Sequence, residues 1–348
     1  MLLSAPVGGP ISKPTSILVI RPGGIGDAVL LIPALHLLRL KFPQSRIDIL
    51  AEKRNGAIFR LCSGINEIFL YDHFGDLWRV LRGGCDVVID SEQWHRLSAV
   101  VSRLTGAGMS VGFATSDRKR LFTHPQPYSH DDYELDSFLS LLSPFDIDHK
   151  KWSGPFLELP PDVKARAKEL LGDYDGQRFV VLFPGASIAE RRWGAEKFGE
   201  LARRLNNQGM PVVVIGGQED RAEAEKIAAR ATVLNLAGRT SLVESAAVID
   251  RATVLVSGDS GILHIGVGLD KPTVSLFGPG IAEKWAPRGE KHVVVDRKLP
   301  CSPCTRFGYT PRCPRNMQCI QEIDVADVER GVKGILEKGT LGRQTSVV

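Results

Sequence analysis

A strand, glycine turn, helix and second strand at the start of the chain constrain the fold most. Ser16–Arg21 is an apolar run of the kind that buried parallel strands show, and Pro22-Gly-Gly-Ile-Gly26 then turns the chain. Helical apolar spacing follows over Ala28–Leu40, and Arg46–Ala51 predicts the second strand. This is a βαβ unit with a right-handed crossover, so a doubly wound parallel sheet is expected.

The alternation of strands and helices continues along both halves. Further strands are predicted at Glu67–Tyr71, Cys85–Asp90, Met109–Phe113, Arg178–Phe183, Pro211–Ile215, Thr232–Leu236, Thr253–Val256 and Lys271–Phe277. Helices are predicted at Phe74–Leu81, Arg96–Leu104, Asp132–Leu142, Val163–Leu171, Ala195–Asn207, Ser241–Ile249 and Val325–Leu336. The basic, His- and Pro-bearing run 118–130 is interpreted as loop.

Two domains are expected, because 348 residues exceed the usual size of one hydrophobic core. Gly and Asp cluster at 172–176 and indicate the boundary. The predicted organisation is a flexible extension 1–14, an N-terminal domain 15–173, a C-terminal domain 174–338 and a polar tail 339–348. The fold class is α/β, with two Rossmann-like domains facing a central cleft.

Charge and hydropathy exclude several functions. The net charge is +4, from 44 basic and 40 acidic side chains, which is too mild to indicate nucleic-acid binding. No apolar run reaches the roughly 18 residues that a membrane-spanning helix needs. Residues 1–14 lack the apolar core of a signal peptide, so a cytoplasmic location is expected.

The stretch from Thr253 to Leu269 is a strand, a polar turn and a helix start. Such a turn leaves free backbone N–H groups pointing to where an anion would bind. Ser260 adds a hydroxyl next to Asp259, Gly261 allows a close approach, and His264 follows one helical turn later. The pattern predicts a pyrophosphate site. The alternative is an N-capped helix with a buried histidine.

The first glycine turn does not predict a dinucleotide site. Gly24 and Gly26 supply two of the three fingerprint glycines, and Asp27 occupies the helix start, where it would repel a pyrophosphate. A carboxylate there is stabilised by the helix dipole. Two interpretations stay open: Asp27 caps the helix, or it acts as a general base at the carboxyl end of a strand.

Two later loops carry polar side chains at strand ends. Pro184–Ser187 is a glycine turn followed by Arg191 and Arg192, which suit a diphosphate leaving group, although adjacent arginines are commonly a solvated surface. Gly216–Asp220 ends the next strand, and Glu219 is the acid favoured there to accept hydrogen bonds from a ribose.

Four cysteines gather at Cys301, Cys304, Cys313 and Cys319. Four thiols at short spacing in a cytoplasmic protein indicate a structural zinc site within a Cys-rich segment 301–319. Unligated reduced thiols, or disulfides, are the alternatives.

Together these loops resemble glycosyltransferase family 9, the ADP-heptose:lipopolysaccharide heptosyltransferases. The motifs that carry the resemblance are Arg21-Pro-Gly-Gly-Ile-Gly-Asp27, Phe183-Pro-Gly-Ala-Ser187 with Arg191-Arg-Trp193, Gly258-Asp-Ser-Gly261-x-x-His264, Leu276-Phe-Gly-Pro279 and the cysteine-bearing segment. They occur in the family's order over residues 16–330. One departure is Arg191, where family members commonly have lysine.

The resemblance implies a GT-B fold whose C-terminal domain holds the nucleotide sugar, and an inverting transfer. Asp27 would activate the acceptor hydroxyl and Arg191 would stabilise the leaving diphosphate, with no cofactor required for catalysis. Residues implied to bind the nucleotide sugar are Gly26, Ala186, Ser187, Arg192, Glu219, Asp259, Ser260, Gly261 and His264.

The implied donor is ADP-heptose and the implied acceptor is a lipopolysaccharide core on lipid A. Such an acceptor makes peripheral association with the cytoplasmic face of the inner membrane possible. The basic run Arg118–Arg120 with Leu121-Phe122 is a candidate contact for acidic lipid, although such a charge run is more commonly a solvated surface. Another donor or acceptor, a nucleotide-sugar epimerase on the same architecture, and a non-catalytic nucleotide-binding protein are the alternatives.

Overall fold

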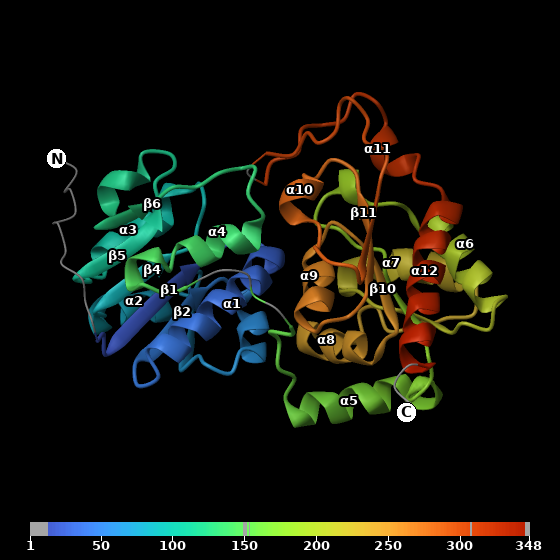
Figure 1. The fold of residues 1–348 in the computed structure, drawn as a ribbon, viewed down its shortest axis with the longest axis horizontal. Coiled ribbons are helices and arrows are strands. Elements are labelled where there is room, and N and C mark those ends of the chain that lie inside the picture. The colour runs from blue at the N-terminus through green and yellow to red at the C-terminus, as the bar shows by residue number, and fades with distance from the viewer. Residues whose placement is uncertain (1–12, 149–151, 153, 307, 345–348) are drawn as a thin grey trace. The chain divides into compact units, whose positions relative to one another are not determined.

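The computed structural model describes residues 13–148, 152, 154–306 and 308–344. The chain divides into two compact units, Met1–Glu158 and Leu159–Val348 (Figure 1). Each unit contains one six-stranded sheet, and every strand pairing within the two sheets is parallel. The α/β class with two parallel sheets is thereby confirmed.

The first sheet has the order β3-β2-β1-β4-β5-β6. Its strands are β1 (Ser16–Arg21), β2 (Arg46–Ala51), β3 (Glu67–Leu70), β4 (Val87–Asp90), β5 (Met109–Phe113) and β6 (His124–Gln126). Strand β6 lies in the run interpreted as loop, and that interpretation was wrong. Its three residues include Pro125, which an edge strand tolerates but which conceals the strand in the sequence.

Helices cover both faces of this sheet. They are α1 (Ile25–Lys41), α2 (Phe74–Gly83), α3 (Arg96–Leu104) and α4 (Glu134–Ser140). Val80 of α2 and Val101 of α3 join one core cluster with Leu18 and Leu50, so α2 and α3 cover the same face. The connection from β1 to β2 moves toward one edge of the sheet, and the connection from β3 to β4 moves toward the other edge. Because both crossovers are right-handed, α1 lies on the face opposite to α2 and α3.

The basic run after β5 is a short 3₁₀ turn, Arg118–Leu121, that packs against α3. Arg118 is fully buried, and its guanidinium lies 2.6 Å from the equally buried carboxylate of Asp90. Phe122 is buried as well. The candidate lipid contact therefore does not include Arg118 and Phe122, two of the five residues of this run, because both belong to the core. Lys119 and Arg120 are the exposed cations.

The second sheet has the order β12-β11-β10-β7-β8-β9. Its strands are β7 (Val180–Phe183), β8 (Val212–Val214), β9 (Leu234–Asn235), β10 (Val254–Gly258), β11 (Thr273–Phe277) and β12 (His292–Asp296). The edge strand β12 was not predicted, because its apolar run is only three valines long.

The helices of this unit are α5 (Pro161–Leu171), α6 (Ala195–Asn206), α7 (Arg221–Ala228), α8 (Leu242–Arg251), α9 (Gly261–Gly268), α10 (Ala282–Trp285), α11 (Gln318–Gln321) and α12 (Val325–Gln344). Helix α5 packs against α8 and so belongs to the second unit, which begins at Leu159, whereas the predicted boundary at 172–176 placed this helix in the first domain.

Helix α12 continues to Gln344, into the segment expected to be a tail. Residues 345–348 of that tail and residues 1–12 of the expected extension lie outside the described residues.

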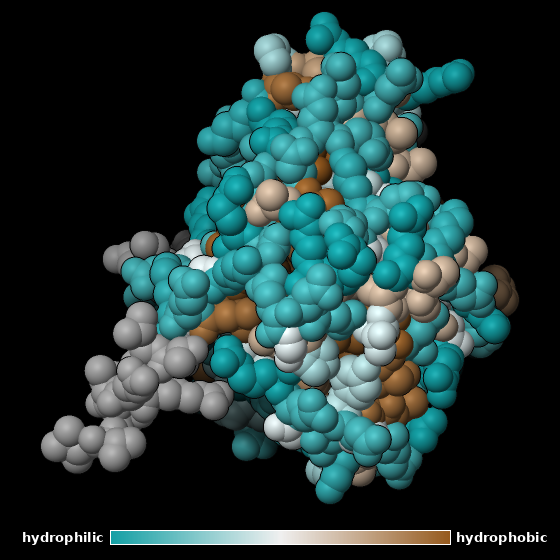
Figure 2. All heavy atoms as spheres, turned by 90° about the vertical axis from the view of Figure 1, so that its right-hand side faces the viewer, coloured by the Kyte–Doolittle hydropathy of each residue, from teal (hydrophilic) through white to brown (hydrophobic). Residues whose placement is uncertain are grey.

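Most of the face turned to the viewer in Figure 2 is hydrophilic. Across the described part of the chain, no helix combines the length and apolar character needed to span a bilayer.

Candidate active site

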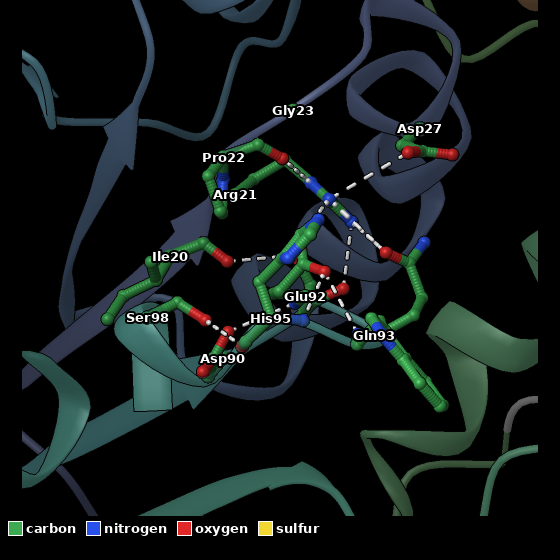
Figure 3. A network of polar contacts seen from close by, with 12 residues as sticks. Ile20, Arg21, Pro22, Gly23, Asp27, Asp90, Glu92, Gln93, His95 and Ser98 are labelled. Atoms are coloured by element: carbon green, nitrogen blue, oxygen red, sulfur yellow. Dashed lines mark hydrogen bonds and ion pairs between the residues drawn. The ribbon is translucent and has the colours of Figure 1, made fainter. Parts of the chain in front are cut away.

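Asp27 lies in the first turn of α1, directly after the turn that leaves β1. Its carboxylate keeps about a fifth of its surface exposed, and its Oδ2 lies 3.7 Å from Nη2 of the buried Arg21 (Figure 3). Both the helix dipole and the guanidinium favour the ionised form. A general base needs this combination of ionisation and access.

The guanidinium of Arg21 is fixed by contacts on several sides. It donates to the backbone carbonyls of Pro22 and Ser91 at 2.6 and 2.8 Å, and it pairs with Glu92 at 3.1 Å (Figure 3). Burial opposes ionisation of Glu92. The charge of Arg21 and the N–H groups at the start of α3 outweigh that effect, so the pKa of Glu92 lies below its usual value.

A chain of hydrogen bonds extends this cluster. Arg21 donates to Oε1 of Gln93 at 3.3 Å, and the Gln93 amide donates to Glu134 at 2.6 Å. The hydroxyl of Tyr128 donates to the same carboxylate at 3.0 Å. Burial and then the charges of Glu134 and Asp27 raise the pKa of Tyr128, so its hydroxyl stays protonated.

Four residues of this cluster were not predicted from the sequence: Glu92, Gln93, Tyr128 and Glu134. Glu92 and Gln93 follow β4, and the carboxyl ends of β4 and β1 lie at one edge of a parallel sheet. That adjacency could have identified these two residues. No comparable signal exists for the other two, which come from distant segments of the chain.

The predicted anion site in the second unit lies between β10 and α9. Ser260 is the N-cap of α9: its hydroxyl accepts the N–H of Leu263 at 3.3 Å and lies 2.8 Å from the Ser257 hydroxyl. The helix begins at Gly261. The site therefore combines a helix N-terminus with two linked hydroxyl groups, an arrangement suited to phosphate oxygens.

Asp259 precedes this cap and is buried. Its Oδ2 lies 3.1 Å from Nη1 of Arg191. Burial raises the pKa of Asp259, and the charge of Arg191 offsets part of that effect. A Cβ at Gly280 would lie 2.2 Å from the same oxygen, so only glycine fits there. The structure thus brings together Arg191 and Asp259, two residues that the resemblance implied for the donor site.

Three buried polar atoms around this turn have no hydrogen-bond partner among the described residues. They are Nε of Arg191, Nδ1 of His264 and Oδ2 of Asp259, the last of which makes the ion pair with Arg191 but no hydrogen bond. Buried polar atoms are normally satisfied, and unsatisfied ones are typical of sites that receive a ligand. The location of these atoms supports the predicted diphosphate site.

His264 lies one turn into α9 and is buried. Burial, followed by the charge of Arg191, lowers the pKa of His264 to about 4. The imidazole is therefore neutral at pH 7 and does not serve as a cationic contact for phosphate. It can act only as a neutral donor or acceptor of hydrogen bonds.

The depressed pKa of His264 predicts a pH-dependent stability. Between pH 6.5 and 4 the unfolded chain binds a proton that the native site excludes, so the free energy of unfolding falls as the pH is lowered through this range. The wild type should lose about 2 kcal/mol more than His264→Gln between pH 7 and pH 5. Denaturant titrations of both proteins at the two pH values measure this difference, and equal losses would contradict the assignment.

Other predicted donor-site residues lie on the loops after β7 and β8. Arg192 donates to the carbonyl of Ala186 at 3.0 Å and so braces the loop that carries the exposed Ser187. Glu219 is exposed, whereas its neighbour Asp220 is buried and accepts the N–H of Gly217 at 3.1 Å. Of these two acids, Glu219 is therefore the accessible one. Gly26 lies in the first unit beside Asp27.

The four clustered cysteines line one cavity of about 200 Å³ with Glu190, Pro279 and Met317. Within the described ranges, however, no three His, Cys, Asp or Glu side chains are arranged to hold a metal ion. The thiols are free. The arrangement of the four thiols does not fit the expected zinc.

A second cavity of about 500 Å³, between β12 and α12, includes none of the predicted site residues.

Comparisons with known proteins identify the family of this chain. The family model described as glycosyltransferase family 9 (heptosyltransferase) matches residues 74–310, more than half of the chain. Lipopolysaccharide heptosyltransferase 3 of Escherichia coli is 26% identical over 344 residues, which cover 91% of this chain and 98% of that protein.

Solved structures share the fold. A glycosyl transferase family 9 protein from Veillonella parvula has a TM-score of 0.79 at 19% identity, covering 95% of this chain and 99% of its own. The E. coli ADP-heptose lps heptosyltransferase II has a TM-score of 0.74 at 22% identity, covering 93% and 99%. The GT-B fold class is confirmed. With more than half of its length matched by the family model, the chain belongs to glycosyltransferase family 9, the heptosyltransferase family.

Proposed function

We propose that this protein transfers a heptose from ADP-heptose to a hydroxyl of the lipopolysaccharide inner core, with inversion at C1. The observation that carries this proposal is the group of unsatisfied buried polar atoms beside Arg191 and the N-terminus of α9. The names of the relatives supply the sugar, the nucleotide and the lipopolysaccharide acceptor.

The donor site has the groups that a diphosphate leaving group requires. Negative charge builds on the phosphate oxygens as the C1–O bond breaks, and Arg191 with the N–H groups of Gly261 and its successors would stabilise it. Asp259 holds Arg191 in place through the ion pair. Glu219 would accept hydrogen bonds from the ribose.

The acceptor reaction uses Asp27. In the proposed step the Asp27 carboxylate takes the proton of the acceptor hydroxyl, the oxygen forms a bond to C1, and ADP leaves with the electron pair of the broken C1–O bond. Arg21 holds the Asp27 carboxylate at the start of α1. This is a single displacement, so the configuration at C1 inverts.

We propose no cofactor for this reaction, since every group that it needs is a side chain or backbone N–H of the protein. For the thiol cavity we favour reduced, unligated cysteines. The lipopolysaccharide acceptor is a membrane lipid, so we further propose peripheral binding at the cytoplasmic face of the inner membrane.

Removing the Arg191 charge should slow transfer. We expect Arg191→Met to lower kcat by about 10²–10³-fold, the usual loss for one charge-stabilising donor. Arg191→Lys should retain most of the activity, because the charge that balances Asp259 remains. ADP release with ADP-heptose and a heptose-deficient lipopolysaccharide measures both variants.

The matched control is Arg221→Met, which removes an exposed arginine paired with Glu225 on α7. It should leave kcat unchanged. Wild-type activity in Arg191→Met would remove this residue from the donor site.

A further inference from the structure

Helix α3 exposes its largest apolar side chains. The residues that it buries are small or only moderately large: Ser98, Ala99, Val101 and Ser102. Leu97, Val100 and Leu104 are 63%, 39% and 61% exposed. Their spacing of three and four residues puts them on one side of the helix. An amphipathic helix of a soluble protein normally buries such residues, so this face is built to contact something else.

Exposed cations lie on the turn that packs against this helix. The 3₁₀ turn Arg118–Leu121 packs against α3 and carries the exposed Lys119 and Arg120. Among the described residues, neither of the two has an ion-pair partner. Arg96 also lies on α3, but its charge is neutralised by Asp117. The face therefore combines apolar side chains with an excess of positive charge.

Aromatic side chains add to this surface. Trp94, just before α3, is 42% exposed. On the same side of the sheet, α2 exposes Phe74 and Trp78, whose rings stack with centroids 6.4 Å apart, and Arg82 lies over the Trp78 ring. Tryptophan with arginine and lysine at the edge of an apolar face is typical of surfaces that lie at a lipid–water interface.

We infer that the α3 face, defined as Trp94, Leu97, Val100 and Leu104 with Lys119 and Arg120, binds an anionic membrane surface. The preference for a membrane over a protein partner rests on the proposed function, in which the acceptor is a lipid. Charge complementarity with acidic headgroups supports it. Helix α3 starts at the sheet edge where β1 ends and α1 carries Asp27, so a lipid held there is presented on the acceptor side.

Vesicle binding tests this inference with the full chain. The wild type should co-sediment with vesicles of phosphatidylcholine and phosphatidylglycerol, and much less with phosphatidylcholine alone. Leu97→Gln/Leu104→Gln should weaken partitioning at least about tenfold. Lys119→Gln/Arg120→Gln should weaken it about 25-fold, at about fivefold per cation. The control Leu40→Gln changes a leucine on α1 that is 74% exposed and should bind as the wild type does.

Activity on a deacylated, water-soluble acceptor separates this inference from the proposed function. All variants should keep wild-type turnover on that acceptor, and the α3 variants should lose turnover on vesicle-bound acceptor. Transfer by the wild type without vesicle binding would overturn the inference and leave the proposed function intact. Unchanged vesicle binding by the leucine variant would also overturn the inference. If the wild type proved to be a dimer in light scattering and the leucine variant a monomer that still binds vesicles, the α3 face would be a protein interface instead.

Discussion

Replacing Asp27 with asparagine should lower kcat for heptose transfer by about 10²–10⁴-fold, the range expected when a general base is lost. Asparagine has the same shape but cannot take the proton of the acceptor hydroxyl. Binding of ADP-heptose should persist, because the predicted donor residues Arg191 and Asp259 are unchanged. Turnover by ADP release and donor binding by calorimetry measure the two effects separately.

Asp76→Asn is the matched control, since Asp76 also lies in the first turn of a helix of the same unit. Hydrogen bonding from Leu70 lowers the pKa of Asp76, so this change should cost some stability while leaving turnover intact. If Asp27→Asn retained wild-type kcat, the base would have to be sought elsewhere.

The largest expected loss of stability comes from Arg118→Met. Arg118 and Asp90 are both fully buried and lie 2.6 Å apart, and Arg118 also donates to the Glu92 carbonyl. Removing one partner leaves a buried charge uncompensated, which costs about 3–5 kcal/mol. For a unit of this size the melting temperature should fall by roughly 6–20 °C in a thermal melt.

Burial raises the pKa of Asp90, so without Arg118 this carboxyl should become protonated. The double variant Arg118→Met/Asp90→Asn should therefore be more stable than Arg118→Met alone. The control Arg96→Met breaks the exposed pair with Asp117 and should cost no more than about 1 kcal/mol. Equal losses from Arg96→Met and Arg118→Met would show that burial of the Arg118 pair is unimportant.

The long apolar runs made most of the fold predictable. Strands such as Val180–Phe183 and Val212–Val214 are buried on both faces, so their sequences are continuous and apolar. The edge strands His124–Gln126 and His292–Asp296 are only partly buried and lack that pattern. An apolar run predicts a strand only where the strand is buried, and these two edge strands are too exposed to require one.

The site was predictable where its residues lie in a contiguous motif, as Asp27 and Asp259–His264 do. Sequence could not reveal that Arg118 is buried, because three adjacent basic residues look the same whether one of them pairs with Asp90 or not. It also could not join Arg191 to Asp259, because Arg191 lies on a 3₁₀ turn well beyond the end of β7, and only the fold brings that turn to the end of β10.

The most direct measurement of the proposed function is a transfer assay with purified protein, ADP-heptose and heptose-deficient lipopolysaccharide, with the anomeric configuration of the product determined by NMR. We predict ADP release that depends on the acceptor, and a product whose configuration at C1 is inverted relative to the donor. Sugar turnover without any acceptor, or a product that retains the donor's configuration, would contradict the single displacement by Asp27.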